Sequence, residues 1–385
     1  MRRVYLDHNA TTPVRQEVLE AMLPYFAERF GNASSVHGFG REARRALEDS
    51  REIVAKAINA EPSEVIFTGS GTEADNTAIK GIALALADKG RHIVTSRVEH
   101  KAVLETCKFL EKQGFRVTYV PVDRTGMVLP ERVAEAIQDD TILVSVMHAN
   151  NEVGTINPIA RIGAICRERG VLFHTDAVQS FCKIPFDVRE MNVDLASFSA
   201  HKIYGPKGVG ALFVRRGIRF TPLLHGGEHE RKRRAGTENV AGIVGFARAV
   251  QLALAEREAE ADRLTRLRDR LWEGIRRRIE RVHLNGHPTE RLPGTLNVSF
   301  EGAEGESILL SLDLKGVAAS SGSACTSGSL LPSHVLEAMG VPPELAQSAV
   351  RFSLGRSNTE EDVDYTVEVL PEIVARLRQM SALEV

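Results

Sequence analysis

The sequence predicts an α/β fold with a mostly parallel sheet in a large domain, followed by a smaller α+β domain. Three observations favour this fold class. Short apolar runs of strand length recur up to Val214. Amphipathic segments bounded by turn residues separate these runs, as crossover helices require. The chain has 385 residues, which exceeds the usual size of one domain, so two domains are expected.

The expected strands are continuous apolar runs, typical of strands buried on both faces of a sheet. They cover residues 64–67, 93–95, 117–120, 142–146, 171–173, 195–198 and 211–214. Helical patterns lie between them, for example at 72–87 and 130–137.

A long charged helical pattern runs from about Ala249 to Glu280, and shorter strands and helices follow it. The sequence has no internal repeat and no Pro-rich linker, so we expect this helix to join the domains. Residues 14–255 would then form the large domain, and residues 1–13 with 256–385 the small one.

Composition limits the possible partners and compartment. The formal net charge is −2, so no overall basic field would draw the chain onto nucleic acid or a membrane surface. No apolar stretch has the length of a signal peptide or a membrane span. Four cysteines occur without a CxxC pair, which suggests neither disulfides nor a zinc site. We therefore expect a cytoplasmic protein without a resident metal.

A polar glycine turn at residues 68–73 follows a strand and opens a helix, so backbone N–H groups gather there as in an anion site. Ser70 and Glu73 also have capping-box spacing, which explains both without a ligand. The G-x-G-x-x-A spacing from Gly69 would fit a dinucleotide, but Glu99 comes late for a ribose contact. A phosphate monoester is the better fit.

Two strand ends carry residues that suit pyridoxal phosphate. Asp176 ends one strand, with Gln179 three residues later, and Lys202 ends the next strand before a turn at 203–208. This cofactor needs a lysine amine for its Schiff base and a carboxylate beside its ring nitrogen. Alone, Asp176 could be a turn residue and Lys202 a solvated lysine. Their joint placement favours a cofactor site.

The stretch from Ser197 to Gly208, SFSAHKIYGPKG, resembles the lysine signature of the class V aminotransferase-fold cysteine desulfurases. Further segments resemble the same family along most of the chain. They are Tyr5-Leu6-Asp7, Ala10-Thr11-Thr12-Pro13, Gly31-Asn32, Thr72-Glu73, Glu99-His100-Lys101, Asn150-Asn151-Glu152-Val153-Gly154 and Arg234-Ala235-Gly236-Thr237-Glu238-Asn239.

The resemblance implies a fold-type I pyridoxal-phosphate transferase with a seven-stranded sheet. It implies that Lys202 carries the cofactor and that His100 stacks on the ring and takes part in proton transfer. Asn151 and Gln179 would contact the cofactor oxygen and the substrate. The implied phosphate ligands are Gly71, Thr72, Ser199 and His201, with Thr237 from a neighbouring subunit, which implies a homodimer. Taken singly, His100 could be a helix cap and Asn151 a turn former.

Cys325 lies in a stretch of small and polar residues from Ala318 to Ser329, which should be mobile and leave a thiol accessible. The other cysteines, Cys107, Cys166 and Cys182, are expected to be small buried hydrophobes. The resemblance is to the longer-loop group of the family, the NifS/IscS type, which implies that Cys325 accepts sulfur. By the same resemblance Arg351 would hold the substrate carboxylate, a role suited to a guanidinium fork.

The implied reaction removes sulfur from L-cysteine, with Lys202, Cys325 and His100 as catalytic residues, and gives alanine and a persulfide on Cys325. The persulfide would pass to an iron–sulfur scaffold or another sulfur-acceptor protein, with at most a transient contact between Cys325 and a cluster. The acceptor and the pathway stay open. Alternatives are an aminotransferase or β-lyase with the same cofactor, a regulator with this fold, and a nicotinamide-dependent dehydrogenase. The basic run 231–234 is interpreted as a solvated surface.

Overall fold

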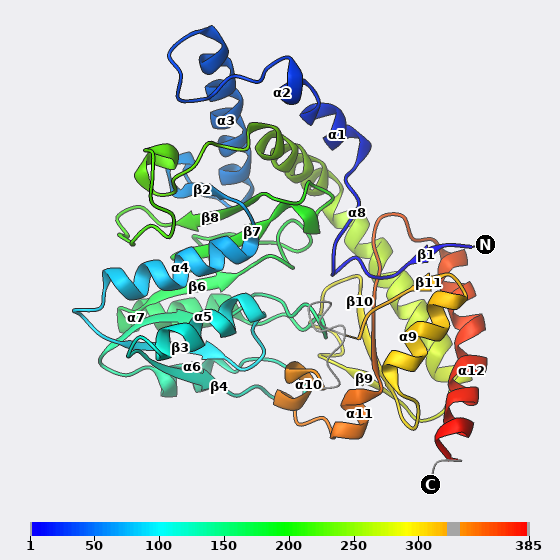
Figure 1. The fold of residues 1–385 in the computed structure, drawn as a ribbon. Coiled ribbons are helices and arrows are strands. Elements are labelled where there is room, and N and C mark those ends of the chain that lie inside the picture. Colours follow the sequence, from blue (N-terminus) through cyan, green and yellow to red (C-terminus); the bar gives the residue numbers. More distant parts are fainter. Residues whose placement is uncertain (1, 322–331, 383–385) are drawn as a thin grey trace.

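The computed structural model describes residues 2–321 and 332–382, which form a large and a small lobe. Cys325 lies outside these ranges. In Figure 1 the large lobe contains the central sheet, and α9 and α12 mark the small lobe. None of the helices in the described ranges has the length and apolar character needed to cross a membrane.

The large lobe is built on a seven-stranded sheet with the order β2-β8-β7-β6-β5-β3-β4. Strands β3 to β7 are parallel, whereas β8 is antiparallel to both of its neighbours. The bounds are β2 (Val65–Thr68), β3 (His92–Ser96), β4 (Arg116–Val120), β5 (Thr141–Ser145), β6 (Leu172–Asp176), β7 (Leu195–Ser199) and β8 (Gly210–Val214). The predicted fold class is therefore confirmed, and the expected strands match within a few residues.

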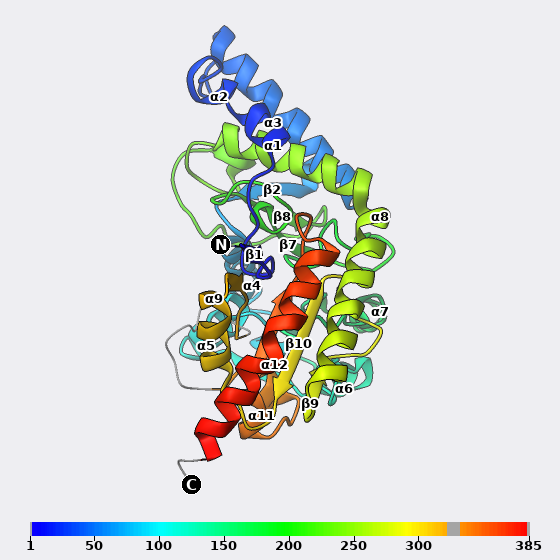
Figure 2. The same cartoon turned by 90° about the vertical axis from the view of Figure 1, so that its right-hand side faces the viewer.

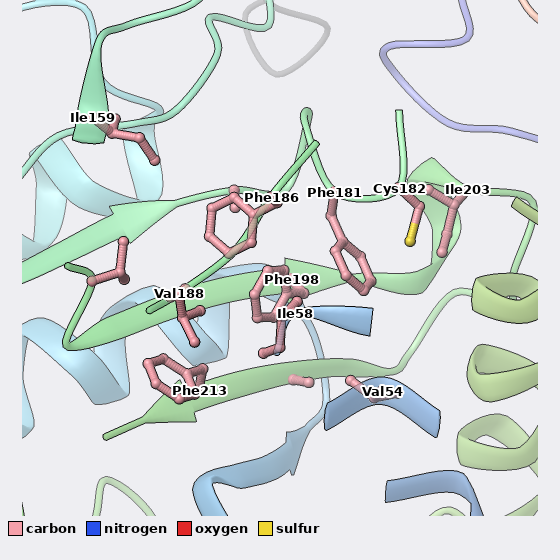
Figure 3. Close-up of a cluster of buried hydrophobic side chains, with 14 of the residues drawn as sticks. Val54, Ile58, Ile159, Phe181, Cys182, Phe186, Val188, Phe198, Ile203 and Phe213 are labelled. Carbon is pink, nitrogen blue, oxygen red and sulfur yellow. The ribbon is translucent and has the colours of Figure 1, made fainter. Parts of the chain in front are cut away.

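Both faces of this sheet are buried, so its strands are apolar at successive positions. In β8, Ala211 and Phe213 belong to one core, while Leu212 and Val214 belong to the core on the opposite face. The first core includes residues of α3 (Gly38–Ala57), α6 (Pro130–Ala136) and α7 (Ile159–Arg169); the second includes residues of α4 (Gly71–Ala85) and α5 (Lys101–Glu111). Figure 3 shows part of the first core, where Phe198 and Phe213 lie near Val54 and Ile58.

Helix α8 (Val240–Arg278) joins the lobes. It begins nine residues before the predicted start, because the side chain of Asn239 caps it by accepting from Gly242 N–H at 3.0 Å. Its first half contributes Phe246 to the large-lobe core, and its second half contributes Leu271 to the small-lobe core. Figure 2 shows α8 beside α12. The domain boundary near Glu256 stays a prediction, supported by this division of α8 between two cores.

The small lobe contains an antiparallel sheet of order β12-β10-β9 and a parallel pair, β1 with β11. Its strands are β1 (Val4–Tyr5), β9 (Val282–Asn285), β10 (Thr295–Phe300), β11 (Val317–Ala318) and β12 (Ala349–Ser353). Its further helices are α9 (Gly305–Leu314), α10 (His334–Ala338), α11 (Pro343–Gln347) and α12 (Glu360–Ala382). The N-terminal strand β1 thus pairs with β11 of the small lobe, and the assignment of residues 1–13 to the small domain stays a prediction.

After this segment the chain enters an arm at the top of Figure 1, formed by α1, α2 and α3. The bounds of the first two are α1 (Gln16–Met22) and α2 (Pro24–Ala27). Short 3₁₀ turns complete the described elements: η1 (Pro62–Glu64), η2 (Ala200–Lys202) and η3 (His229–Lys232).

Candidate active site

A cavity of about 230 Å³ lies at the carboxyl ends of the large-lobe strands, where open α/β sheets bind ligands. Arg351 from β12 and the N-terminal segment close it from the other side. The lining residues are Asn9, Ala10, Ser70, Gly71, Thr72, Asp75, His100, Met147, Asn151, Asp176, Val178, Gln179, Ser199, His201, Lys202 and Arg351.

The described residues that were predicted to bind cofactor or substrate all line this cavity, with the exception of Thr237. Thr237 is exposed on the segment before α8. Its absence from this chain's cavity is compatible with the predicted contact to a second subunit. The individual roles of all these residues stay predictions.

The start of α4 forms the phosphate end of the cavity. Ser70 Oγ accepts from Glu73 N–H at 3.0 Å, and Glu73 Oε2 accepts from Gly69 N–H at 2.7 Å, one residue beyond the usual capping-box partner. Residue 71 must be small, because a Cβ there would lie 2.7 Å from Val178 Cγ2. The N–H groups of Gly71 and Thr72, the first two of α4, have no partner inside the helix and can bind an anion.

Arg234 supports this turn from outside. Its Nε donates to Glu73 Oε1 at 2.8 Å, and its Nη2 donates to Glu73 Oε2 at 3.2 Å. Interpreting residues 231–234 as a solvated surface was therefore wrong for Arg233 and Arg234, which are partly buried. It was right for Arg231 and Lys232, which are exposed. Charge runs do not show which member faces inward.

Asp176 ends β6 and is buried in the cavity wall. Its Oδ1 accepts a hydrogen bond from Val178 N–H at 2.9 Å, and the nearby His174 pairs with Asp75 and not with Asp176. Burial raises the pKa of this carboxyl, while His100 and Lys202 oppose the rise. A cationic N–H group in the cavity would supply the missing partner.

Lys202 follows β7 in the turn η2. Its Nζ donates to the carbonyl oxygens of Asn9 at 2.5 Å and Ala10 at 2.7 Å. The turn beyond it is held by Tyr204, which takes a φ of 64° and donates its N–H to Thr12 Oγ1 at 2.8 Å. The N-terminal segment thus fixes both the lysine and the turn that presents it.

His100 is both a helix cap and a cavity residue. Its Nδ1 accepts from Ala102 N–H at 3.1 Å at the start of α5. Burial lowers its pKa, so the ring is neutral near pH 7 and carries its proton on Nε2. Burial likewise lowers the pKa of His201 to about 4, which leaves a second neutral imidazole in the cavity wall.

Arg351 crosses from the small lobe with only 2% of its side chain exposed. Its Nη2 donates to Asp7 Oδ1 at 2.8 Å, and its Nη1 donates to the carbonyl oxygen of Asn151 at 3.0 Å. These contacts hold the guanidinium against the cavity, where it can meet a carboxylate.

Sequence reasoning missed several lining residues. Asn9 and Ala10 act through backbone carbonyls, for which sequence gives no signal apart from the neighbouring family-like segments. Asp75 lies three residues after Thr72 on one helix face, a spacing that could have indicated that Asp75 lines the cavity.

Burial and the charge of Asp176 raise the pKa of the Asp75 carboxyl well above its usual value. The ligand atoms of Asp75, His100 and Asp176 lie within 4.8 Å of one another, but they border the same cavity.

The three cysteines in the described ranges are buried and unpaired, as predicted. Burial raises the pKa of the thiols of Cys107, Cys166 and Cys182. They are therefore poor nucleophiles.

The cavity fits pyridoxal phosphate feature by feature. The start of α4 suits the phosphate, the buried Asp176 suits a protonated ring nitrogen, and the Lys202 amine lies in the same cavity wall. Fold and site together define an enzyme dependent on pyridoxal phosphate.

Comparisons with known proteins agree. Residues 4–366 match the model of the aminotransferase class-V family. The chain is 58% identical to the cysteine desulfurase IscS of Methanosarcina thermophila, over 99% of this chain and 94% of that protein. The solved structure of a NifS-like protein superposes with a TM-score of 0.92 at 44% identity, covering 98% of this chain and all of that one. A structure of SspA in complex with cysteine has a TM-score of 0.82 at 39% identity and covers 91% and 98%.

The chain belongs to the aminotransferase class-V family. The family resemblance inferred from the sequence is thus confirmed, and with it the use of pyridoxal phosphate. The same matches argue against the dinucleotide alternative for the Gly69 turn.

Proposed function

We propose that the protein is a cysteine desulfurase that takes sulfur from L-cysteine, leaves L-alanine and holds the sulfur as a persulfide on Cys325. The observation that carries the proposal is the meeting of Lys202, Asp176 and Arg351 at one cavity. It is supported by a relative named cysteine desulfurase that matches 99% of the chain, and by the related SspA complex with cysteine. In this proposal the activity supplies sulfur for iron–sulfur cluster assembly and for other sulfur-containing products.

When bound, pyridoxal phosphate supplies an electron-accepting ring that makes the bonds around the substrate α-carbon labile. In the proposal, Gly71, Thr72, Ser199 and His201 hold its phosphate, and Asp176 holds the ring nitrogen proton. Gln179 and Asn151 contact its oxygen and the substrate, and Thr237 of a second copy completes the phosphate site in a homodimer.

Arg351 would orient L-cysteine by its carboxylate. The guanidinium already contacts Asp7 and the Asn151 carbonyl, so it needs little reordering when the substrate arrives. A preformed, buried guanidinium favours a carboxylate strongly because little water competes for it.

Lys202 and His100 would move the protons. The Lys202 amine would take the α-proton, with the Asn9 and Ala10 carbonyls as hydrogen-bond acceptors when it is an ammonium. The neutral His100, with its proton on Nε2, can donate a proton to the substrate and recover it later.

Cys325 would attack the substrate sulfur. Immediately before its segment, Ser320 N–H donates to the Arg351 carbonyl at 3.1 Å, and Arg351 N–H donates to the Ser320 carbonyl at 2.6 Å. Cys325 comes five positions after Ser320, a length of chain that spans at most about 18 Å.

The test is a comparison of Cys325→Ser with wild type on L-cysteine. We expect the variant to bind the cofactor normally but to lose persulfide formation and the matching alanine, because serine cannot accept the sulfur atom. The matched control is Cys166→Ala, which removes a buried thiol outside the cavity and should retain both products. Undiminished sulfur transfer by Cys325→Ser would favour an aminotransferase or β-lyase instead.

A further inference from the structure

A second lysine lies close to the cavity on the turn that follows β6. Lys183 Nζ donates to Gln179 Oε1 at 3.1 Å, its one direct hydrogen bond within the described ranges. Burial lowers the pKa of this amine to about 7, with further contributions from the positive charges of Lys202 and Arg351. Lys183 is half-buried, and no carboxylate partner pairs with it within the described ranges, so its position requires an explanation.

The turn from Ala177 to Ile184 directs Lys183 toward Gln179. Phe181 N–H donates to the Ala177 carbonyl at 2.9 Å, and Ile184 N–H donates to the Ser180 carbonyl at 3.1 Å. Figure 3 shows Phe181 and Cys182 pointing into the core. Cys182 has a φ of 59°, so the turn bends at this residue, and Lys183 reaches back to Gln179, four positions earlier.

Lys183 also fixes which end of the Gln179 amide faces the cavity. In its protonated form Lys183 can only donate, so below the amine pKa of about 7 Oε1 of Gln179 faces Lys183. Nε2 then donates to the Asn9 carbonyl at 2.9 Å, the oxygen that also accepts from Lys202 Nζ. A cation on Oε1 polarises the amide and makes its N–H a stronger donor.

We propose that Lys183 is a positioning residue that, through Gln179, holds and polarises the amide N–H facing Lys202 and the cofactor oxygen. This inference rests on the proposed function, which assigns the cofactor and the role of Lys202. A stronger donor at the cofactor oxygen and a nearby positive charge both disfavour a proton on the Lys202 nitrogen. Without Lys183 the pKa of the Lys202 nitrogen should therefore be higher.

The experiment uses the holoenzyme without substrate and follows the pH midpoint of the visible absorbance of the bound cofactor. Lys183→Met should raise this midpoint by roughly 0.5–1 pH unit, and Lys183→Gln, which retains an N–H donor without charge, should raise it less. The control Lys112→Met, at an exposed lysine directly after α5, should match wild type.

Other titratable and charged groups near the Lys183 amine are present in each of these proteins. They are Lys202, Arg351 and His8, together with groups of a separate cavity that Lys183 lines. The groups of that cavity are Cys182, Arg15, Tyr204, Glu256, Arg257, Glu260 and Arg356. Because wild type and variants share them, their direct titrations cancel in the comparison.

A double-mutant comparison tests the path through Gln179. In a Gln179→Ala background, adding Lys183→Met should give less than half of the shift seen in wild type. An unshifted midpoint in Lys183→Met, or an undiminished shift in the Gln179→Ala background, would overturn the inference. Lys183→Met replaces a buried cation with an apolar chain of similar shape, so its thermal midpoint should not fall.

The two proposals fail in different ways. Wild-type protein that shows no cofactor absorbance after incubation with pyridoxal phosphate would contradict the proposed function. Normal wild-type absorbance and sulfur transfer, with a Lys183→Met midpoint equal to wild type, would contradict only the role of Lys183.

Discussion

Buried acids surround the active site, and Glu99 is the most enclosed of them. Its side chain is inaccessible, Oε1 accepts from Ser96 Oγ at 2.5 Å and from Met147 N–H at 3.0 Å, and Oε2 has no hydrogen-bond partner within the described ranges. Burial raises its pKa to about 8. A neutral acid avoids the cost of a buried charge while it ties the turn before His100 to the end of β5.

This environment predicts a pH-dependent effect of Glu99→Gln. Between its ordinary pKa of 4.5 and about 8, the folded protein holds a proton that the unfolded chain has released, so Glu99 reduces stability as pH rises through that window. Glutamine mimics the neutral acid and does not titrate. The variant should equal wild type near pH 5 and exceed its thermal midpoint by roughly 2–5 °C near pH 8.5.

Thermal unfolding of both proteins with saturating cofactor at the two pH values checks this prediction. Glu344→Gln, at an exposed carboxyl, is the control and should follow wild type at both. If the thermal midpoints of Glu99→Gln and wild type differ by the same amount at pH 5 and pH 8.5, Glu99 does not titrate as described.

Single residues were predictable where a strand end and a specific chemical need coincide. Asp176 and Lys202 end neighbouring parallel strands, β6 and β7, so the sequence places both at one sheet edge. Glu99 was weighed only as a ribose ligand, because its contact with Met147 depends on β3 pairing with β5. Sequence does not give that strand order.

At the scale of elements, one buried ion pair connects α3, β2 and the segment before α8. Arg51 donates to both carboxylate oxygens of Glu230 at 2.7 and 2.8 Å, and each side chain is 2% exposed. Glu230 Oε2 also accepts from Phe67 N–H at 2.9 Å, next to the phosphate turn. Glu230, Arg231 and Lys232 all have positive φ, a strained arrangement that this anchor helps to hold.

Glu230→Gln should therefore destabilise the protein by about 3 kcal/mol, because it leaves the Arg51 charge buried with one partner weakened. Denaturant unfolding of the variant measures the loss. The control is Glu228→Gln in the same segment. The ion pair of Glu228 with Lys232 at 2.8 Å is largely exposed, so its loss should not measurably change the free energy of unfolding. Equal stability of the two variants would mean that the Arg51 pair does not anchor the segment.

The elements themselves were largely predictable, and helix α8 shows where prediction fell short. Its charged second half has a clear amphipathic pattern, but its first turns contain Gly242 and Gly245 among apolar residues. Gly245 is needed because a Cβ there would lie 2.5 Å from Met22 Sδ. Close packing on α1 thus selects residues that disfavour a helix when judged from sequence alone.

For the whole molecule, the two-lobe plan was predictable because each lobe has its own apolar core. The closure of the cavity between the lobes was not. It depends on the N-terminal segment, which pairs with β11, places Asp7 against Arg351 and presents the Asn9 and Ala10 carbonyls to Lys202. These are contacts between residues far apart in sequence, and no local pattern encodes them.

The predicted homodimer also belongs to this scale. Apolar side chains are exposed on the arm of α1 to α3: Leu23, Phe26, Phe30, Val36 and Phe39 are 55–88% exposed. The rings of Phe30 and Phe39 stack with centroids 5.6 Å apart. Monomers rarely expose this many large apolar side chains on one arm, so we expect a second copy to cover them.

The double variant Phe30→Asp/Phe39→Asp should dissociate the dimer, because two charges cannot be buried in an apolar interface without partners. Sedimentation should show a dimer for wild type and a monomer for the variant. The monomer should also bind pyridoxal phosphate more weakly, by roughly tenfold or more, since Thr237 of the second copy would no longer reach the phosphate. Leu314→Asp changes a residue on α9 that is 73% exposed, and should leave both properties intact. A monomeric wild type, or a dissociated variant with undiminished cofactor affinity, would show that each chain completes its own phosphate site.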